Sequence, residues 1–264
     1  RIEGDHTNYH CGSAAVTRSM LHALEPRGLV VEGKNYDVLV VNGEGTMHHA
    51  SQGFHRKMKL LKKAVEAGKA AYLVNTVWQD NPNDYDDVLR SLDGIIVRED
   101  MSRLELLNKH GVKARMHPDL AYYAPLKPAN NVIDYKGSIV ITDFFSKEFD
   151  TFVRLTRAEA VKYPFVDMMS VEWDDLVASL KTAEMLVTGR HHGVFAACRA
   201  EIPFIAFGGN THKIEGIFRS AAVNIPLCES RAKLPEMIEW TRANRAEYQK
   251  LFDWLKSFGG LNLN

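Results

Sequence analysis

An excess of one charge is missing from this sequence of 264 residues, because Lys plus Arg and Asp plus Glu both number 33. Without net charge the chain has no long-range attraction for nucleic acid or for an anionic membrane, so any anion must be held by a local site. Long apolar runs are missing too: Ile202 to Phe207, interrupted by Pro203, is far shorter than the ~20 residues that cross a bilayer. We therefore expect no nucleic-acid partner and no transmembrane segment.

Cysteine is scarce as well. Cys11, Cys198 and Cys228 are odd in number and widely spaced, which argues against a disulfide framework. No basic start followed by an apolar run marks a secretory signal peptide, so we expect a cytoplasmic protein with free thiols. The chain begins without methionine, and Arg1-Ile2-Glu3 is very short for a first strand, so we expect a few residues to precede it in the full protein.

What the sequence does contain is the composition of a globular protein, with 45% hydrophobic and 25% charged residues. Single cores stop growing beyond ~250 residues, so this length favours two lobes. Residues 125 to 136, with two prolines and Asn130-Asn131, have the turn-forming composition of a linker. We place the boundary there, with one lobe over residues 1–128 and the other over residues 129–264.

Runs rich in Val and Ile alternate with amphipathic stretches along both predicted lobes, which indicates an α/β fold built on parallel sheets. No internal repeat interrupts the alternation. The predicted strands cover 36–41, 70–75, 94–98, 137–142, 165–169, 185–188 and 203–207, and the predicted helices cover 13–24, 52–67, 85–92, 102–110, 147–161, 173–182, 194–200 and most of 234–258.

Polar segments fall where the predicted strands end, which is where open α/β sheets bind their ligands. The turn from Gly4 to Ser13 precedes the first helix and is dense in hydrogen-bonding side chains; it either holds an anion at the helix start or only caps the helix through Ser13 or Gly12. Asn42-Gly43-Glu44-Gly45-Thr46 follows a Val-rich strand, and its glycines permit close approach of a ligand. His48 and His49 come next, and we expect their side chains to point apart.

Besides these two polar segments, a set of positively charged residues lies at predicted strand ends. Arg98 ends one predicted strand, Arg190 and His192 follow another, and Lys213 lies beyond a third. Arginine forks match phosphate and carboxylate, and a neighbouring histidine can move protons near neutral pH. Taken singly, Arg98 is better explained by a salt bridge with Glu99 or Asp100 and Arg190 by a surface charge beside a helix, but three cationic strand ends together predict an anion site.

In order and rough spacing these segments resemble the polysaccharide pyruvyl transferase family. The resemblance covers most of the chain, and its most specific element is the ordered set of the Arg98 segment, Pro118-Asp119 and Arg190-His191-His192-Gly193. Asn8 to Ser13 departs from it, standing where many members have a simpler Asn-x-Gly turn. The resemblance implies two Rossmann-like lobes of the GT-B type with the active site in the cleft between them. It further implies a transferase of polysaccharide biosynthesis that moves pyruvate from phosphoenolpyruvate to a sugar or glycan acceptor.

By the same resemblance the residues receive roles. His192 is the expected general acid, Arg98 and Arg190 grip the donor phosphate and carboxylate, and Asp119 orients a histidine or is a turn residue. Lys213 completes the neutralisation of the donor. We expect no metal and no separate cofactor, since this chemistry requires neither. The residues expected to bind substrate are Asn8, Gly12, Gly43, Gly45, Thr46, His191 and Lys213.

Two other functions stay open on the sequence. A glycosyltransferase that uses a nucleotide sugar would place Arg190 and Lys213 on a diphosphate within the same architecture. An inactive sugar-binding protein is the other, and its aromatic candidates Tyr9, Trp78, Tyr122 and Tyr123 are equally well explained by packing.

Overall fold

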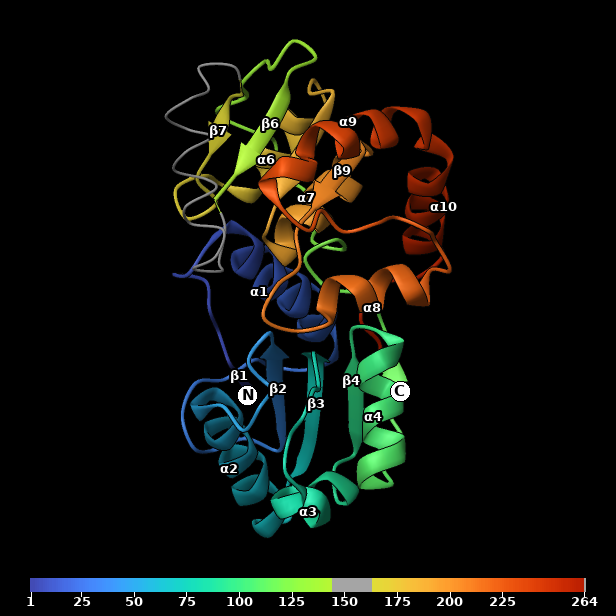
Figure 1. Cartoon of the computed structure of the whole chain (residues 1–264). Coiled ribbons are helices and arrows are strands. Elements are labelled where there is room, and N and C mark those ends of the chain that lie inside the picture. Colours follow the sequence, from blue (N-terminus) through green and yellow to red (C-terminus); the bar gives the residue numbers. More distant parts are fainter. Residues whose placement is uncertain (144–162, 264) are drawn as a thin grey trace.

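The computed structural model describes residues 1–143 and 163–263, and they form two parallel sheets with helices around them (Figure 1). The five strands of the first sheet stand in chain order, each hydrogen-bonded to the next. Strand β2 runs to Glu44, where it pairs with Thr76 of β3. The strands are β1 (Ile2–Glu3), β2 (Val38–Glu44), β3 (Ala70–Thr76), β4 (Gly94–Val97) and β5 (Arg115–Met116).

The second sheet has the order β7-β6-β8-β9 in the described part of the chain. Its order reverses beside β6, so β6 and β8 flank the topological switch point, which is the usual ligand site of such sheets. Asp143 directly follows β6, and Arg190 is the second residue after the end of β8. The strands are β6 (Ile139–Thr142), β7 (Phe165–Val166), β8 (Met185–Thr188) and β9 (Phe204–Ala206).

Helices connect these strands. Helix α2 illustrates how the sequence forms them. Ser51 caps this helix by accepting a hydrogen bond from Phe54 N, and Phe54, Met58 and Leu61 form its buried face. The described helices are α1 (Cys11–Leu24), α2 (Gln52–Glu66), α3 (Asp86–Arg90), α4 (Asp100–His110), α6 (Trp173–Leu180), α7 (His191–Ala200), α8 (Lys213–Ser220), α9 (Leu234–Ala243) and α10 (Arg245–Lys256).

Two helices differ from the sequence prediction, and one predicted helix is not tested. Helix α7 begins at His191 rather than Val194, because Gly193 in its first turn lets the helix approach the Thr188 side chain; a Cβ there would lie 2.3 Å from Thr188 Oγ1. Helix α8 was not predicted, although Ile214, Ile217 and Phe218 are buried at helical spacing. The predicted helix over residues 147–161 lies outside the described residues.

The two sheets share one hydrophobic core. One buried cluster contains Val40 and Val74 of the first sheet together with Val140 and Leu186 of the second. Helix α1 belongs to the same cluster and lies between the two sheets in Figure 1. Its start is bonded to the second lobe, where Cys11 N donates to Met168 O over 3.0 Å. Two further clusters cover the outer faces of the sheets.

The chain crosses between the sheets more than once. The predicted boundary at residues 128 and 129 falls between β5 and β6, and the division of the chain there stays a prediction. After α10 the chain returns to the first sheet, where Gly259 O contacts His117 Nε2 at 2.8 Å. In Figure 1 the C-terminus accordingly lies beside α4.

Candidate active site

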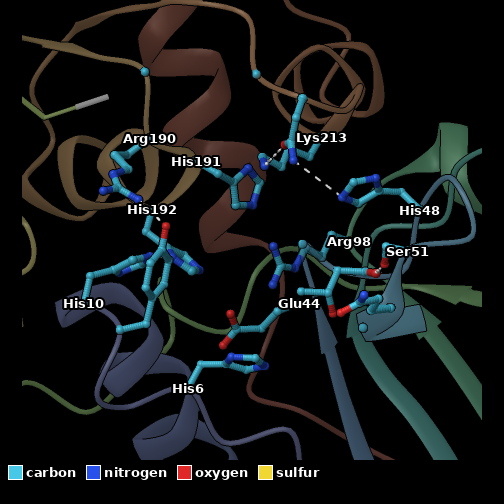
Figure 2. Close-up of a pocket in the computed structure, with 18 residues that line it drawn as sticks. His6, His10, Glu44, His48, Ser51, Arg98, Arg190, His191, His192 and Lys213 are labelled. Carbon is cyan, nitrogen blue, oxygen red and sulfur yellow. Dashed lines mark hydrogen bonds between the residues drawn. The ribbon is translucent and has the colours of Figure 1, made fainter. Parts of the chain in front are cut away.

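A pocket of about 500 Å³ lies between the two lobes, with walls from the ends of β2, β4 and β8 (Figure 2). Its volume falls in the range of small-molecule sites, ~300–1,000 Å³. Seven of the eleven predicted site residues line it: Gly45, Thr46, Arg98, Arg190, His191, His192 and Lys213.

The other four predicted residues do not line this pocket. Asn8 is exposed and lines a second hollow next to it. Gly12 and Gly43 are packing positions, because a Cβ on Gly12 would lie 2.3 Å from His192 Cβ and one on Gly43 would lie 2.2 Å from Thr76 Oγ1. Asp119 is completely buried behind the pocket.

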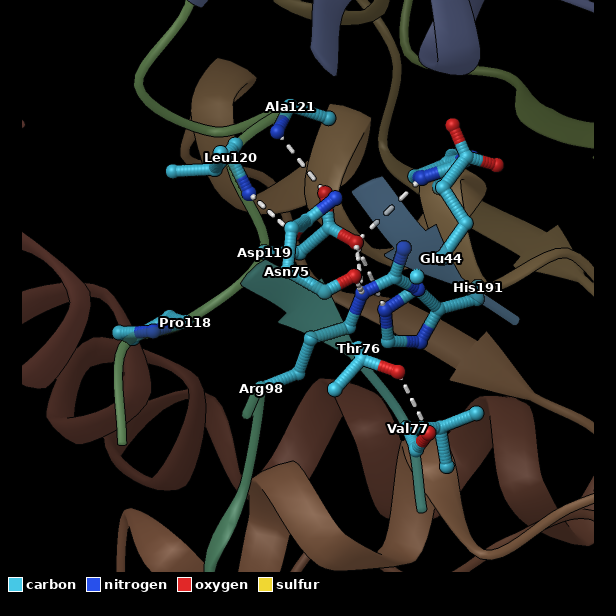
Figure 3. Close-up of polar contacts among 12 residues, drawn as sticks. Glu44, Asn75, Thr76, Val77, Arg98, Pro118, Asp119, Leu120, Ala121 and His191 are labelled. Carbon is cyan, nitrogen blue, oxygen red and sulfur yellow. Dashed lines mark hydrogen bonds and ion pairs between the residues drawn. The ribbon is translucent and has the colours of Figure 1, made fainter. Parts of the chain in front are cut away.

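Asp119 organises the pocket floor (Figure 3). Its Oδ2 lies 2.9 Å from Arg98 Nε, 3.2 Å from His191 Nε2 and 3.4 Å from His192 Nε2. Burial alone would raise the pKa of Asp119, but Arg98 and His192 hold it well below its usual range, so the carboxylate stays charged. Both histidines therefore face the same oxygen, and neither is turned away from the cleft.

Buried polar atoms near Asp119 lack hydrogen-bond partners. Arg98 Nη2, His191 Nδ1 and His192 Nε2 are buried and have no hydrogen-bond partner among the described residues. Arg98 Nε donates to Asn75 O over 3.0 Å and also contacts Asp119. The Nη2 end of the guanidinium stays without a partner in the described part of the chain, and Arg98 lines the pocket. Unsatisfied buried polar groups cost ~1–3 kcal/mol each, and an anionic ligand would satisfy Arg98 Nη2.

Arg190 stands on the opposite wall at the switch point of the second sheet. Its Nε donates to Asp143 Oδ2 over 2.6 Å, and its Nη1 donates to the Tyr9 hydroxyl over 2.6 Å. The Tyr9 ring also lies below the guanidinium, 5.4 Å from centroid to Cζ. Arg190 is therefore a buried cation whose orientation is fixed by Asp143 and Tyr9, rather than a surface charge. The sequence alone does not point to Asp143, because a single Asp after a strand carries no signal of its partner.

His10 caps helix α1 and touches His192. Its Nδ1 accepts from Gly12 N at 3.1 Å and from Ser13 N at 3.3 Å, and its Nε2 lies 3.2 Å from His192 Nδ1. Burial, followed by His192 and Arg190, lowers the pKa of His10 to about 2, so the ring is neutral. A neutral ring whose Nδ1 accepts must carry its proton on Nε2. The Nε2–H of His10 therefore points at Nδ1 of His192.

The helix start therefore has a cap other than the expected one. We predicted Ser13 or Gly12 in this role, but histidine is outside the usual set of capping residues, so sequence reasoning missed His10. Because its lone pair is used on the helix, the N-terminus of α1 is not free for a ligand.

Lys213 comes from the second lobe and lies over the glycine-rich turn of the first. A Cβ on Gly45 would be 3.6 Å from Lys213 Nζ, and Nζ donates to Asn210 Oδ1 over 2.8 Å. Burial and the neighbouring Arg98 and Arg190 lower the pKa of Lys213 to about 8. The ammonium is thus a titratable part of the cationic wall.

The glycine-rich turn is held from below by Lys57, which is buried. Lys57 Nζ donates to Gly43 O over 2.7 Å and to Thr46 Oγ1 over 2.8 Å, and burial lowers its pKa to about 7. Glu44 in this turn has φ +45°, a left-handed conformation that costs a non-glycine residue energy. The sequence alone does not single out Lys57, because it lies in a helix rich in basic residues, whose side chains are usually solvated.

The paired histidines after this turn correct a prediction. His48 and His49 do not point apart, because their Nδ1 atoms lie 2.9 Å from each other. The turn there has positive φ at His49 and Ala50, which folds the two side chains together. His48 lines the pocket, and burial followed by His49 lowers its pKa to about 4.

Of the four aromatic candidates, Tyr9 alone lines the pocket. Trp78 is completely buried and donates from Nε1 to His110 Nε2 over 3.1 Å. Tyr122 is buried in the central core, and Tyr123 donates to Leu255 O. These three are packing residues.

Within residues 1–143 and 163–263, no group of three or more His, Cys, Asp or Glu side chains could hold a metal ion. The same ranges contain no helix of the length and apolarity that crossing a membrane requires. The three cysteines are buried free thiols.

Comparison with known proteins decides the family. The sequence pattern of the polysaccharide pyruvyl transferase family matches residues 5–211, which is well over half of the chain. The chain belongs to the polysaccharide pyruvyl transferase family. The match spans every pocket residue of this pyruvyl transferase family member up to Asn210 and stops just before Lys213. A comparison with curated proteins gives no match.

Solved structures share the fold of this pyruvyl transferase family member at low sequence identity. MnaA from S. aureus, solved with UDP, is 11% identical with a TM-score of 0.56, covering 94% of this chain and 76% of that one. A putative UDP-N-acetylglucosamine 2-epimerase from Listeria monocytogenes is 10% identical with a TM-score of 0.55, covering 92% and 73%. A functionally uncharacterised protein from Klebsiella pneumoniae is 13% identical with a TM-score of 0.53, covering 81% and 85%. The likeness shows a GT-B-like fold of two Rossmann-like lobes.

Proposed function

We propose that this protein transfers pyruvate from phosphoenolpyruvate to two hydroxyls of a sugar in a glycan, forming a cyclic ketal. The observation that carries the proposal is the cationic wall with its unpartnered donors. Arg98, Arg190 and Lys213 converge on one pocket, and Arg98 Nη2 has no hydrogen-bond partner among the described residues. Phosphoenolpyruvate brings a phosphate and a carboxylate on a small frame, which matches several separated cations.

The reaction needs a proton on the methylene carbon of the donor and two hydroxyl attacks on the adjacent carbon. Phosphate leaves with the electron pair of its C–O bond as the second hydroxyl attacks. The arginines stabilise the negative charge that builds on the departing phosphate. The chain's own side chains supply these functions, and we propose no metal or further cofactor.

We assign the proton delivery to His192. Its ring lines the pocket between His10, 3.2 Å from its Nδ1, and Asp119, 3.4 Å from its Nε2, and imidazole is suited to proton transfer near neutral pH. Asp119 holds both histidine rings in place and does not itself meet the substrate, since it is completely buried.

The competing proposal is a glycosyltransferase with a nucleotide sugar donor. The neighbour solved with UDP shows that the fold can accept a nucleotide, but the likeness reaches only the fold. A thermal-shift titration separates the two, because a ligand that binds only the native state raises the melting temperature by mass action. We expect stabilisation by phosphoenolpyruvate. Stabilisation by UDP-sugars and not by phosphoenolpyruvate would favour the glycosyltransferase.

A further inference from the structure

Glu44 is a buried carboxylate in the pocket that the donor chemistry does not use. It is 6% exposed, lines the pocket and ends strand β2. Its oxygens accept from neutral donors, Ser13 Oγ at 3.2 Å and Asn42 Nδ2 at 3.2 Å. Among the described residues no Lys, Arg or His forms an ion pair with it, and Lys57 instead binds Gly43 O and Thr46 Oγ1. Glu44 therefore lacks a direct ion-pair partner among the described residues, although Lys57 and His6 lie near enough to interact with its charge.

The backbone that carries the Glu44 side chain adopts an energetically unfavourable conformation. Glu44 has φ +45°, and Asn75 at the end of the neighbouring strand β3 has φ +51°. Asn75 donates to Asn42 Oδ1 over 3.1 Å, and Asn42 donates to Glu44, so the strained strand ends form one network. Strain in such conformations persists where the surrounding structure requires it, commonly at functional sites. A purely structural residue here would be expected to be glycine, which adopts this φ freely.

The position of Glu44 divides the pocket in two. Figure 2 shows its carboxylate between His6 and Arg98, away from Lys213. On this side the pocket meets the second hollow, of about 440 Å³, because His6 and Tyr9 line both. The hollow is otherwise lined by Asp5, Thr7 and Asn8, whose polar groups suit sugar hydroxyls. An acceptor lying there would extend past His6 toward Glu44, with Tyr9 and its partner Arg190 on the other side.

We infer that Glu44 is the general base for the acceptor and that the hollow at residues 5–9 holds the adjoining sugar of a glycan. This inference rests on the proposed pyruvyl transfer. The attacking hydroxyl loses its proton to a Glu44 oxygen as its own oxygen bonds to the donor's central carbon, while the methylene carbon gains a proton from the acid. The second hydroxyl then attacks, phosphate leaves and takes that second proton, and the proton on Glu44 returns to the acid through solvent.

The test compares Glu44→Gln, Glu44→Gly and the control Glu66→Gln, an exposed carboxylate paired with Lys62 on α2. Phosphoenolpyruvate binding is measured by calorimetry, and phosphate release is measured with methyl glycosides of glucose, galactose and mannose and with water as the acceptor. We expect Glu44→Gln to bind phosphoenolpyruvate with an affinity within ~2-fold of wild type. We expect its phosphate release to fall by ~100-fold or more, the usual scale of a missing general base. Glu66→Gln is expected to behave as wild type.

Glu44→Gly keeps the test valid if the amide variant folds poorly, since glycine relieves the strained φ. We expect it to melt at or above the wild-type temperature while still losing phosphate release. Release within ~3-fold of wild type in either folded variant overturns the role of Glu44, because a missing base costs ~100-fold. Lost phosphoenolpyruvate binding in a folded variant overturns it too, by placing Glu44 on the donor side. Absence of donor binding and of phosphate release in the wild type instead overturns the proposed function.

Discussion

The Nε2 atom of His10 and the Nδ1 atom of His192 lie 3.2 Å apart, and the helix that His10 caps decides which of them carries the proton. Amide protons of α1 occupy Nδ1 of His10, so its Nε2 donates. This makes the start of α1 in the first lobe a determinant of the tautomer of a residue on α7 in the second. The hydrogen bond that His192 Nδ1 receives and the capping of α1 are therefore coupled.

The first prediction concerns this contact. His10→Asn keeps an oxygen that can cap α1, whereas His10→Ala removes the cap and is expected to cost ~1 kcal/mol of stability. We expect both variants to lose turnover by ~10-fold or more, because displacement of a reacting group by ~1 Å can cost ~100-fold. Melting temperature and kcat are measured on both. Wild-type turnover in His10→Asn would reduce His10 to a helix cap.

A second prediction separates the two neighbouring histidines. His192→Gln is expected to keep the fold and the donor affinity and to lower turnover by ~100-fold or more, since a general acid contributes on that scale. His191→Gln is expected to lose less. If His191→Gln proves the more damaging in a well-folded protein, the pair of His191 and Asp119 delivers the proton instead, because His191 Nδ1 can gain a proton without breaking a contact among the described residues.

The arginines should differ in what their removal costs. Arg190→Ala is expected to weaken phosphoenolpyruvate binding by about 2 kcal/mol, as for loss of a partner to a buried anion. Arg98→Ala leaves Asp119 buried without its main counter-charge and is expected to destabilise the fold by roughly 3–5 kcal/mol. Calorimetric titration and denaturant unfolding measure the two effects. Arg242→Ala, which removes an exposed arginine, is the control. Equal stability of Arg98→Ala and wild type would contradict the ion pair's role.

Donor affinity should fall above neutral pH because of Lys213. Its pKa is lowered to about 8, so its positive charge is lost as the pH rises through 8, whereas a donor phosphate with a second pKa of ~6 is already fully ionised there. We expect the dissociation constant of phosphoenolpyruvate to increase between pH 7 and pH 9 in wild type. Lys213→Arg stays charged and should show a flat profile. The same slope in both proteins would assign the titration to another group.

Stability should carry a separate pH signature from His212, which joins the lobes. His212 Nε2 lies 3.3 Å from Glu99 Oε1, and although burial opposes it, Glu99 raises the pKa of His212. A raised pKa in the folded state gives stability that is present below the unfolded value of ~6.5 and is lost as the pH rises through the folded value. His212→Asn should therefore lower the melting temperature at pH 5.5 and change it little at pH 9. An equal loss at both values would contradict a charged contact.

How far the sequence predicts this site depends on the range of each interaction. The strand ends at Arg98 and Arg190 were visible because Val- and Ile-rich runs mark buried parallel strands locally. The partner of Arg190 was not, since Asp143 is 47 residues away and meets it only when β6 and β8 pair. Glu44 was seen only as part of a glycine-rich turn. Its placement comes from β2 continuing beside β3, a tertiary effect that local propensity does not contain.

The prediction of two lobes meeting at a linker needs the same qualification. Helix α1 belongs to the first lobe in sequence, yet Arg18 pairs with Asp174 of α6 at 2.7 Å and Gly12 packs on His192. Nothing in the amphipathic pattern of residues 13–24 indicates which sheet its apolar face covers. Sequence periodicity predicts that a face is buried, and only the assembled fold decides against what.

The buried cluster that runs from Val40 through α1 to Leu186 has a thermodynamic consequence. Lobes that touched only through a linker would melt independently, each with its own enthalpy. Here neither sheet can lose its inner face without exposing that of the other, so the protein should absorb heat in a single transition whose van't Hoff and calorimetric enthalpies agree. The shared interior makes one cooperative unit of two Rossmann-like halves.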